Sequence, residues 1–309
     1  MIREIKPKSN LDKRFDLIRD REVFGYNPKE SGNRAFKKLK SNRLAVIGLI
    51  FVLAIIFTSI FAPLFTKYNP QKVDLRNMLK PPNAEHILGT DKIGRDVFAR
   101  IIYGGRISIL VGLGSALGAA LIGVSIGAYT GYRGGGWDSI FLRISEIVMS
   151  FPQIILVLLL VSILGQSLMN LIIIFTLTGW GSLYRMTRAQ MLSLREEEYV
   201  QALRAFGLSR ARICFKHILP NALGPIMVNI TLSTAMFILE EAALSFLGLG
   251  VPLNIPTWGN ILNVAQDLRV LQNYWWVWLP SGITISLFVL AINFVGDGLR
   301  DSTDPTLQG

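Results

Sequence analysis

The residues able to carry out chemistry are few in this chain and lie far apart. Its 309 residues include two histidines, His86 and His217, and a single cysteine, Cys214. Their spacing matches none of the patterns with which His and Cys side chains hold a tetrahedral metal ion, and a lone cysteine has no disulfide partner within the chain. The sequence therefore predicts no metal site.

Two familiar enzyme motifs give no evidence of catalysis in this sequence. Residues 123–127 match the G-x-S-x-G string of a serine nucleophile, but they lie inside a long apolar stretch with no histidine base nearby. The G-x-x-x-x-G-K-[ST] loop that holds nucleotide phosphates does not occur. We expect no catalytic residue and no cofactor in this chain, so that another chain would supply the energy for any uphill work.

The composition is that of a membrane protein. Apolar residues make up 51% of the chain and charged residues 17%, against roughly 25% charged residues in soluble domains. A bilayer core about 30 Å thick needs about 20 apolar helical residues. Six stretches qualify, and they are residues 44–65, 107–129, 144–164, 168–184, 222–247 and 277–295. The sequence predicts an all-α membrane protein with six transmembrane helices.

The positive charges predict the orientation of these spans. With six spans, both termini lie on one side, which carries 23 Lys and Arg residues against nine on the other. Cytoplasmic segments keep positive charge during insertion, so we expect both termini in the cytoplasm. The loop 66–106 is the weak point, because it holds eight of the nine opposing cations.

The second span is rich in glycine. Gly114 and Gly118 are four residues apart, as are Gly123 and Gly127. This G-x-x-x-G spacing allows close approach of two helices in lipid. Packing within the bundle is the simpler interpretation, and a subunit interface is the alternative.

The clearest polar element lies between the fourth and fifth spans, within residues 196–221. The sequence predicts one short helix that ends at Gly207, and a second that begins at Ser209 and stops at Pro220. A DNA-binding helix-turn-helix has a similar layout, but duplex DNA could hardly reach a helix pinned against lipid headgroups. We therefore expect no nucleic-acid partner. A docking element for a cytosolic protein is favoured over a passive loop.

This element resembles the EAA loop of ABC importer permeases, a cytoplasmic helix pair that inserts into a groove of an ATPase subunit. Ala202, Gly207, Leu219 and Pro220 match the family pattern, while Gln201, Leu203 and His217 depart from it. Three further stretches are similar to signatures of the dipeptide, oligopeptide and nickel branch, in its C-type subunit. They are LGTDKIGRDV at 88–97, LSFLGLG with WG at 244–250 and 258–259, and GDGLRD with DP at 296–305.

The resemblance implies a type I ABC importer permease. Its parts would be a cytoplasmic basic segment at 1–43, a six-span permease domain at 44–300 with a coupling loop at 185–221, and a cytoplasmic tail at 301–309. It further implies a second, B-type permease, two ATPase subunits and an extracytoplasmic substrate-binding protein. Peptides are the expected cargo, and nickel or another small solute is the alternative.

The resemblance also indicates which residues would contact the ATPase. The expected contact edge holds Gln201, Ala202, Leu203, Ala205, Phe206 and Gly207, with Leu219 and Pro220 completing the matched loop. Phe206 offers the large apolar side chain typical of an interface hot spot. The alternative is that Phe206 packs beneath the loop.

Glu240 and Glu241 lie deep in the fifth span. A carboxyl group inside a membrane costs several kcal/mol unless it faces the bundle interior, water or a partner. Adjacent helical residues point about 100° apart, so we expect at most one of the two to face a translocation path or gate. A hydrogen-bonded anchor between helices is the alternative. An intramembrane enzyme is a less favoured function, because no His, Cys or Asp side chain joins these carboxylates. A membrane-tethered transcriptional regulator, based on the similarity to a helix-turn-helix, is also less favoured.

Overall fold

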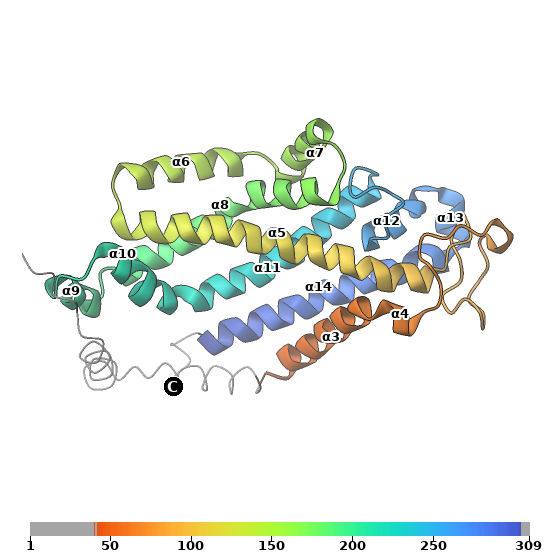
Figure 1. Cartoon of the computed structure of the whole chain (residues 1–309), viewed down its shortest axis with the longest axis horizontal. Coiled ribbons are helices and arrows are strands. Elements are labelled where there is room, and N and C mark those ends of the chain that lie inside the picture. The colour runs from red at the N-terminus through yellow and green to blue at the C-terminus, as the bar shows by residue number, and fades with distance from the viewer. Residues whose placement is uncertain (1–39, 41, 304–309) are drawn as a thin grey trace, which may run out of the picture.

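A computed structural model describes residue 40 and residues 42–303 of the chain. The proposed cytoplasmic segments 1–43 and 301–309 lie for the most part outside the described residues. The described part consists of helices and loops, with one isolated β-bridge between Thr90 and Asp96. Its long helices lie side by side along the long axis of the molecule (Figure 1). The predicted all-α architecture is confirmed.

The helices follow one another with short connections, except for two longer loops at residues 66–96 and 247–257. In chain order they are α3 (Arg43–Ile60), α4 (Ala62–Phe65), η2 (Leu75–Asn77), α5 (Val97–Arg133), α6 (Gly136–Ser150), α7 (Gln153–Leu164), α8 (Leu168–Leu194), α9 (Glu198–Ala205), α10 (Arg210–Arg212), the π-helix η3 (Ile213–Ile218), α11 (Leu219–Phe246), α12 (Trp258–Leu262), η4 (Asn263–Gln266), α13 (Leu268–Asn273) and α14 (Trp275–Thr303).

Four helical segments in the described part are long and apolar enough to cross a membrane. They are α3, α5, the run from Arg210 to Phe246 that ends in α11, and α14. These segments contain the first, second, fifth and sixth predicted spans almost completely. The fourth, in α8, has a shorter apolar stretch that is followed by Arg185 and Arg188.

The third predicted span, residues 144–164, is interrupted. Helix α6 ends at Ser150, and α7 begins at Gln153 in a direction 89° away. Pro152 explains the break, because proline has no N–H to donate to the helix and disfavours helical conformation in the residue before it. Phe151 is accordingly extended, with ψ of 141°. Counted together, α6 and α7 would make a fifth crossing.

The glycines of the second span pack within the bundle. A Cβ atom at Gly123 would lie 2.5 Å from the carbonyl oxygen of Trp180, and one at Gly127 would lie 2.7 Å from that of Tyr184. Only a residue without a side chain permits this approach of α5 to α8. The simpler interpretation of the G-x-x-x-G spacing is therefore confirmed at this pair. Phe175, Leu183 and Tyr184 of α8 are fully buried in the same core.

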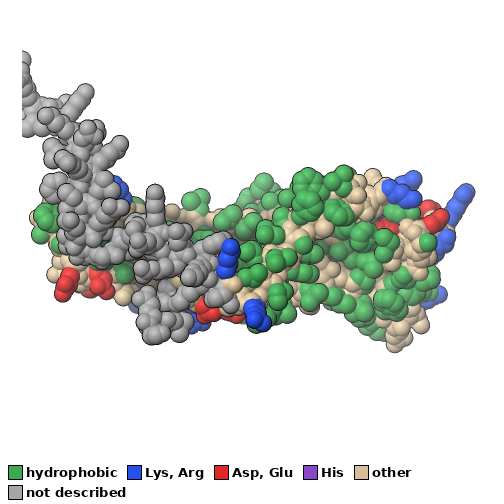
Figure 2. Space-filling model, turned by 90° about the horizontal axis from the view of Figure 1, so that it is seen from below, with side chains coloured by type: hydrophobic (Ala, Val, Ile, Leu, Met, Phe, Trp, Pro, Cys, Tyr) green, Lys and Arg blue, Asp and Glu red, His purple; other side chains and the backbone are tan. Residues whose placement is uncertain are grey.

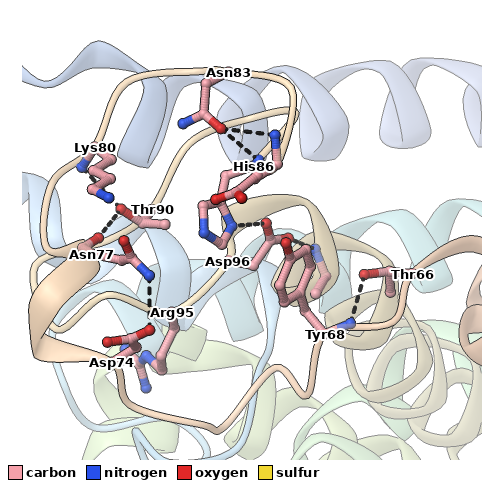
Figure 3. Close-up of polar contacts among 12 residues, drawn as sticks. Thr66, Tyr68, Asp74, Asn77, Lys80, Asn83, His86, Thr90, Arg95 and Asp96 are labelled. Carbon is pink, nitrogen blue, oxygen red and sulfur yellow. Dashed lines mark hydrogen bonds and ion pairs between the residues drawn. The ribbon is translucent and has the colours of Figure 1, made fainter.

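A polar network orders the loop at one end of the bundle (Figure 3). Asp91 is fully buried and accepts charge-assisted hydrogen bonds of 2.7 Å from both Arg95 and Arg100. Asp96 contacts His86 Nδ1 at 2.8 Å and caps α5 by accepting from the N–H of Ala99. The signature at 88–97 thus has a structural basis, since its acidic residues tie the loop to the start of α5.

The outer surface fits a lipid environment. Figure 2 shows apolar side chains covering the middle of the face formed by α3 and α14, with charged side chains outside this band. Ile47, Ile50 and Leu53 of α3 are all more than half exposed. In water such a continuous apolar face would be unfavourable, whereas in a bilayer it faces hydrocarbon.

Candidate functional site

The predicted helix pair between the fourth and fifth spans is present at the end of the bundle opposite the ordered loop (Figure 1). Helix α9 ends as expected, with Gly207 in the left-handed conformation at φ +74°. Ser209 caps the second helix by accepting a hydrogen bond from the N–H of Arg212. Both local predictions are confirmed.

The second helix does not stop at Pro220, and that prediction is wrong. The chain passes from α10 through the π-helix η3 directly into α11, with Pro220 in the first turn of α11. Proline fits there because the first helical residues need no internal N–H partner. The side chain of the next residue, Asn221, donates a hydrogen bond of 3.1 Å to the carbonyl of His217, one turn earlier. The coupling element is therefore continuous with the membrane helix that follows it.

One face of this helix pair is anchored to the bundle. Val200, Leu203, Ile213, Cys214 and Ile218 are buried against Ala128 and Tyr132 of α5 and Met191 of α8. The thiol of Cys214 donates to the carbonyl of Ala128 at 3.3 Å and is fully buried. A thiol reagent would therefore not report the location of this segment through Cys214. Burial of this face means that a force on the pair is passed to α5 and α8.

The other face is open. Phe206 is 78% exposed at the tip of the pair, so the alternative in which it packs beneath the loop does not hold. Gln201, Ala205, Gly207 and Pro220 are also exposed, while Ala202 and Leu219 are partly buried. Leu203 differs from the expectation, because it is only 5% exposed and packs on the side of α9 that faces the bundle. Because successive helical residues are rotated by about 100°, Leu203 faces the bundle, and Phe206 at the end of α9 faces outward.

Glu241 occupies a sealed polar site between three segments. It is fully buried and accepts hydrogen bonds from Ser245 of its own helix at 2.7 Å and from Ser108 of α5 at 3.1 Å. Ser108 Oγ in turn accepts from the backbone N–H of Trp258 at the start of α12. These bonds join α5, α11 and α12. The structural alternative is the one that fits Glu241.

Glu240 lies in a different environment, as the 100° rotation between neighbours requires. Its carboxylate is half-buried and accepts a hydrogen bond of 3.0 Å from Gln153. Gln153 is the first residue of α7, directly after the break at Pro152. The bend therefore brings a polar side chain to the one carboxylate of this pair that remains accessible.

Sequence reasoning did not identify two contributors to this region. Gln153 had a visible signal, because it follows a proline inside an apolar stretch. The ion pair of Asp138 and Arg188 had none, since the two residues lie 50 positions apart in the chain. In the described residues, no group of three or more His, Cys, Asp or Glu side chains is placed to hold a metal ion.

Comparison with known proteins identifies the family. Residues 123–309 match the family described as binding-protein-dependent transport system inner membrane component. The chain belongs to this permease family. Residues 32–82 match the N-terminal transmembrane domain of oligopeptide transport permease C.

Similar permeases match along most of their length. The dipeptide transport system permease protein DppC of Alkalihalophilus pseudofirmus is 43% identical over 89% of this chain and 90% of its own. The oligopeptide transport system permease protein OppC of Bacillus subtilis is 42% identical over 89% of each. DppC of Bacillus subtilis is 39% identical over 89% of this chain and 85% of its own. The chain is thus a multi-pass inner-membrane permease subunit without a catalytic role of its own.

The different environments of Glu240 and Glu241 predict that removing each carboxylate lowers the free energy of unfolding by a different amount. Glu241→Ala leaves buried hydroxyl groups without their acceptor, at a cost of about 1–3 kcal/mol for each group. Glu240→Ala loses one half-buried hydrogen bond and should cost less. The thermal unfolding midpoint of the purified complex in detergent, taken at one heating rate, should fall clearly further for Glu241→Ala. Equal midpoints for the two variants would contradict the anchoring role of Glu241.

Proposed function

We propose that this chain is one half of the translocation pathway of an ABC importer for dipeptides or oligopeptides. The observation that carries the proposal is the anchored helix pair with an exposed Phe206, in a chain whose relatives are named dipeptide and oligopeptide permeases. A B-type permease supplies the other half. Two ATPase subunits bind the helix pair and hold ATP and magnesium, and an extracytoplasmic substrate-binding protein delivers the cargo.

The membrane topology in this proposal has six crossings with both ends in the cytoplasm. The bent pair α6 and α7 forms the third crossing and α8 the fourth. A hydrogen bond of 3.2 Å from the Asn42 side chain to Asp301 supports an even number of crossings, because it brings the start of α3 to the end of α14.

The opposing charge in the loop 66–106 is also less than its eight cations suggest. Arg95 and Arg100 both pair with Asp91, whose one negative charge offsets one of their two positive charges, and Arg106 donates to the carbonyls of Ser59 and Ile60 at the end of α3. These three arginine side chains form contacts within the protein.

Reconstitution tests the function directly. Vesicles that hold the complete complex, with the binding protein outside and ATP inside, are expected to take up a labelled dipeptide or oligopeptide. Uptake should stop without ATP and in the presence of vanadate. Uptake of nickel or another small solute in place of peptides would support the alternative cargo. Uptake of none of these would contradict an importer function.

The coupling role of Phe206 predicts a loss of ATPase binding. Removing an aromatic hot spot costs about 2 kcal/mol or more, which is about a 30-fold weaker Kd. Phe206→Ala should show this loss in a titration of the permease pair with ATPase subunits. Phe65→Ala is the control, since Phe65 is an exposed aromatic residue at the opposite end of the bundle. Unchanged affinity in Phe206→Ala would remove the proposed contact and, with it, the main support for the orientation.

Glu240 is proposed to line the cargo path, where it meets the positive amino terminus of a peptide. Glu240→Gln removes the charge and keeps the size. It should lower uptake of peptides with a free amino terminus about fivefold relative to N-acetylated peptides, because a partly exposed ion pair contributes up to about 1 kcal/mol. Glu146→Gln, in an exposed pair on α6, is the control. A loss equal for both kinds of peptide would contradict recognition of the amino terminus.

A further inference from the structure

Helix α11 connects the coupling helices directly to Glu240, and a second segment, α6 with α7, residues Gly136–Leu164, also contacts Glu240. We call this segment the bent arm. Figure 1 shows it lying along one side of the bundle, over α5 and α8. None of its residues belongs to the coupling element, although Gln153 at its bend contacts Glu240.

The root of the bent arm is a glycine joint. Gly134 and Gly135 have φ of +66° and +82° with ψ near −160°, a backbone conformation that is essentially restricted to glycine. A Cβ atom at Gly135 or Gly136 would meet nothing within 4 Å. Packing at Gly135 and Gly136 therefore does not fix the direction of α6, and contacts beyond these two exposed residues must do so.

One ion pair provides such a contact. The Asp138 carboxylate receives two hydrogen bonds of 2.6 Å from Arg188 of α8, one from Nε and one from Nη2. The hydroxyl of Tyr184 donates to the Asp138 carbonyl at 3.3 Å. A two-pronged guanidinium–carboxylate contact fixes orientation as well as distance. It lies in the first turn of α6, directly after the glycine joint.

The remainder of α6 packs on the bundle core with its inner face, through Phe141 and Leu142, and is open on its outer face. Trp137, Ile140, Ile144 and Ile147 are exposed on its outer face. Its other ion pair, between Arg143 and Glu146, is exposed and stays within the helix. The inner face packs mainly against α8, whose Gly181 would place a Cβ 3.2 Å from Met149. The bent arm is thus fixed to α8 and not to the open side.

Helix α8 itself leads into the coupling element. It ends at Leu194, and α9 begins four residues later at Glu198. At the other end of α6, the bend at Pro152 places Gln153 against Glu240 of α11, with a hydrogen bond of 3.0 Å. A continuous set of contacts therefore runs from α9 through α8 and the Asp138–Arg188 pair to Glu240.

We propose that Asp138 and Arg188 are positioning residues that make the bent arm follow α8, so that movement of the coupling helices changes the contact between Gln153 and Glu240. The inference rests on the proposed function, in which the ATPase subunits move those helices. Coupling between two sites requires an element that both can shift, and the jointed arm is such an element.

A double-mutant cycle tests the ion pair. In reconstituted vesicles, peptide uptake and ATP hydrolysis are measured together for Asp138→Asn, Arg188→Gln and the double variant. Each single variant should lower uptake per ATP about fivefold or more, and the double variant no further, because both remove one interaction. Arg143→Gln, which opens the exposed pair on the same helix, should keep the wild-type ratio. Unchanged ratios in the single variants, or effects that multiply in the double variant, would overturn the proposal.

Arg188→Lys replaces Arg188→Gln if the latter does not assemble, since it keeps the charge and loses the two-pronged geometry. A spin label at Ser150→Cys gives a second readout that is independent of the cargo. Ser150 is exposed beside the bend, and the native Cys214 is buried. Vanadate trapping should change the spectrum in the otherwise wild-type complex and not in the Arg188 variant. A label that responds equally in both overturns the proposal, whereas a complex that responds normally but takes up no peptide contradicts only the proposed function.

Discussion

The close contact of α5 with α8 is the constraint on which the remainder of this structure depends. Helices in lipid gain little from burying apolar side chains, so their association relies on close packing and on internal hydrogen bonds. Gly123 and Gly127 bring the two backbones together, and Gly131 extends the contact to Arg188, where a Cβ would lie 3.1 Å from the Cα atom of Arg188. The same contact therefore supports the coupling helices at its end and the bent arm on its side.

Much of the architecture was predictable because it depends on local rules. Apolar stretches of sufficient length, the glycine after α9 and the serine before α10 each act within a few residues, and the structure places four of the six stretches and both caps as expected. The two prolines were harder to interpret. Pro152 breaks a helix and Pro220 starts one, although both remove the same N–H group. The difference comes from the turns before them, which no single-residue rule describes.

The two carboxylates that the sequence marked as candidate functional groups lie in different environments, which only their three-dimensional contacts reveal. Glu240 and Glu241 are neighbours of the same type in one helix, yet Glu241 is enclosed by Ser108 and Ser245 while Glu240 meets only Gln153. Sequence reasoning could state that they point in different directions, but not which of them faces the interior. Similarly, the two acidic residues of the 88–97 signature form ion pairs or hydrogen bonds with Arg95, Arg100 and His86. A conspicuous motif of charged residues can thus serve the fold alone.

Relative motion within the bundle has few places to occur. The α5–α8 contact is too close for sliding, since interlocked backbones have no intermediate position that avoids overlap. The regular α-helical hydrogen-bond pattern changes beside this block at the glycine joint before α6, at the break at Phe151–Pro152 and at the π-helix before α11, and motion can occur at these points. The first two bound α6, and the third connects the coupling helices to α11. In the proposed function, a force on the exposed face of α9 would act on α5 and α8 together, while α11, which carries Glu240, is joined to the coupling helices through the π-helix.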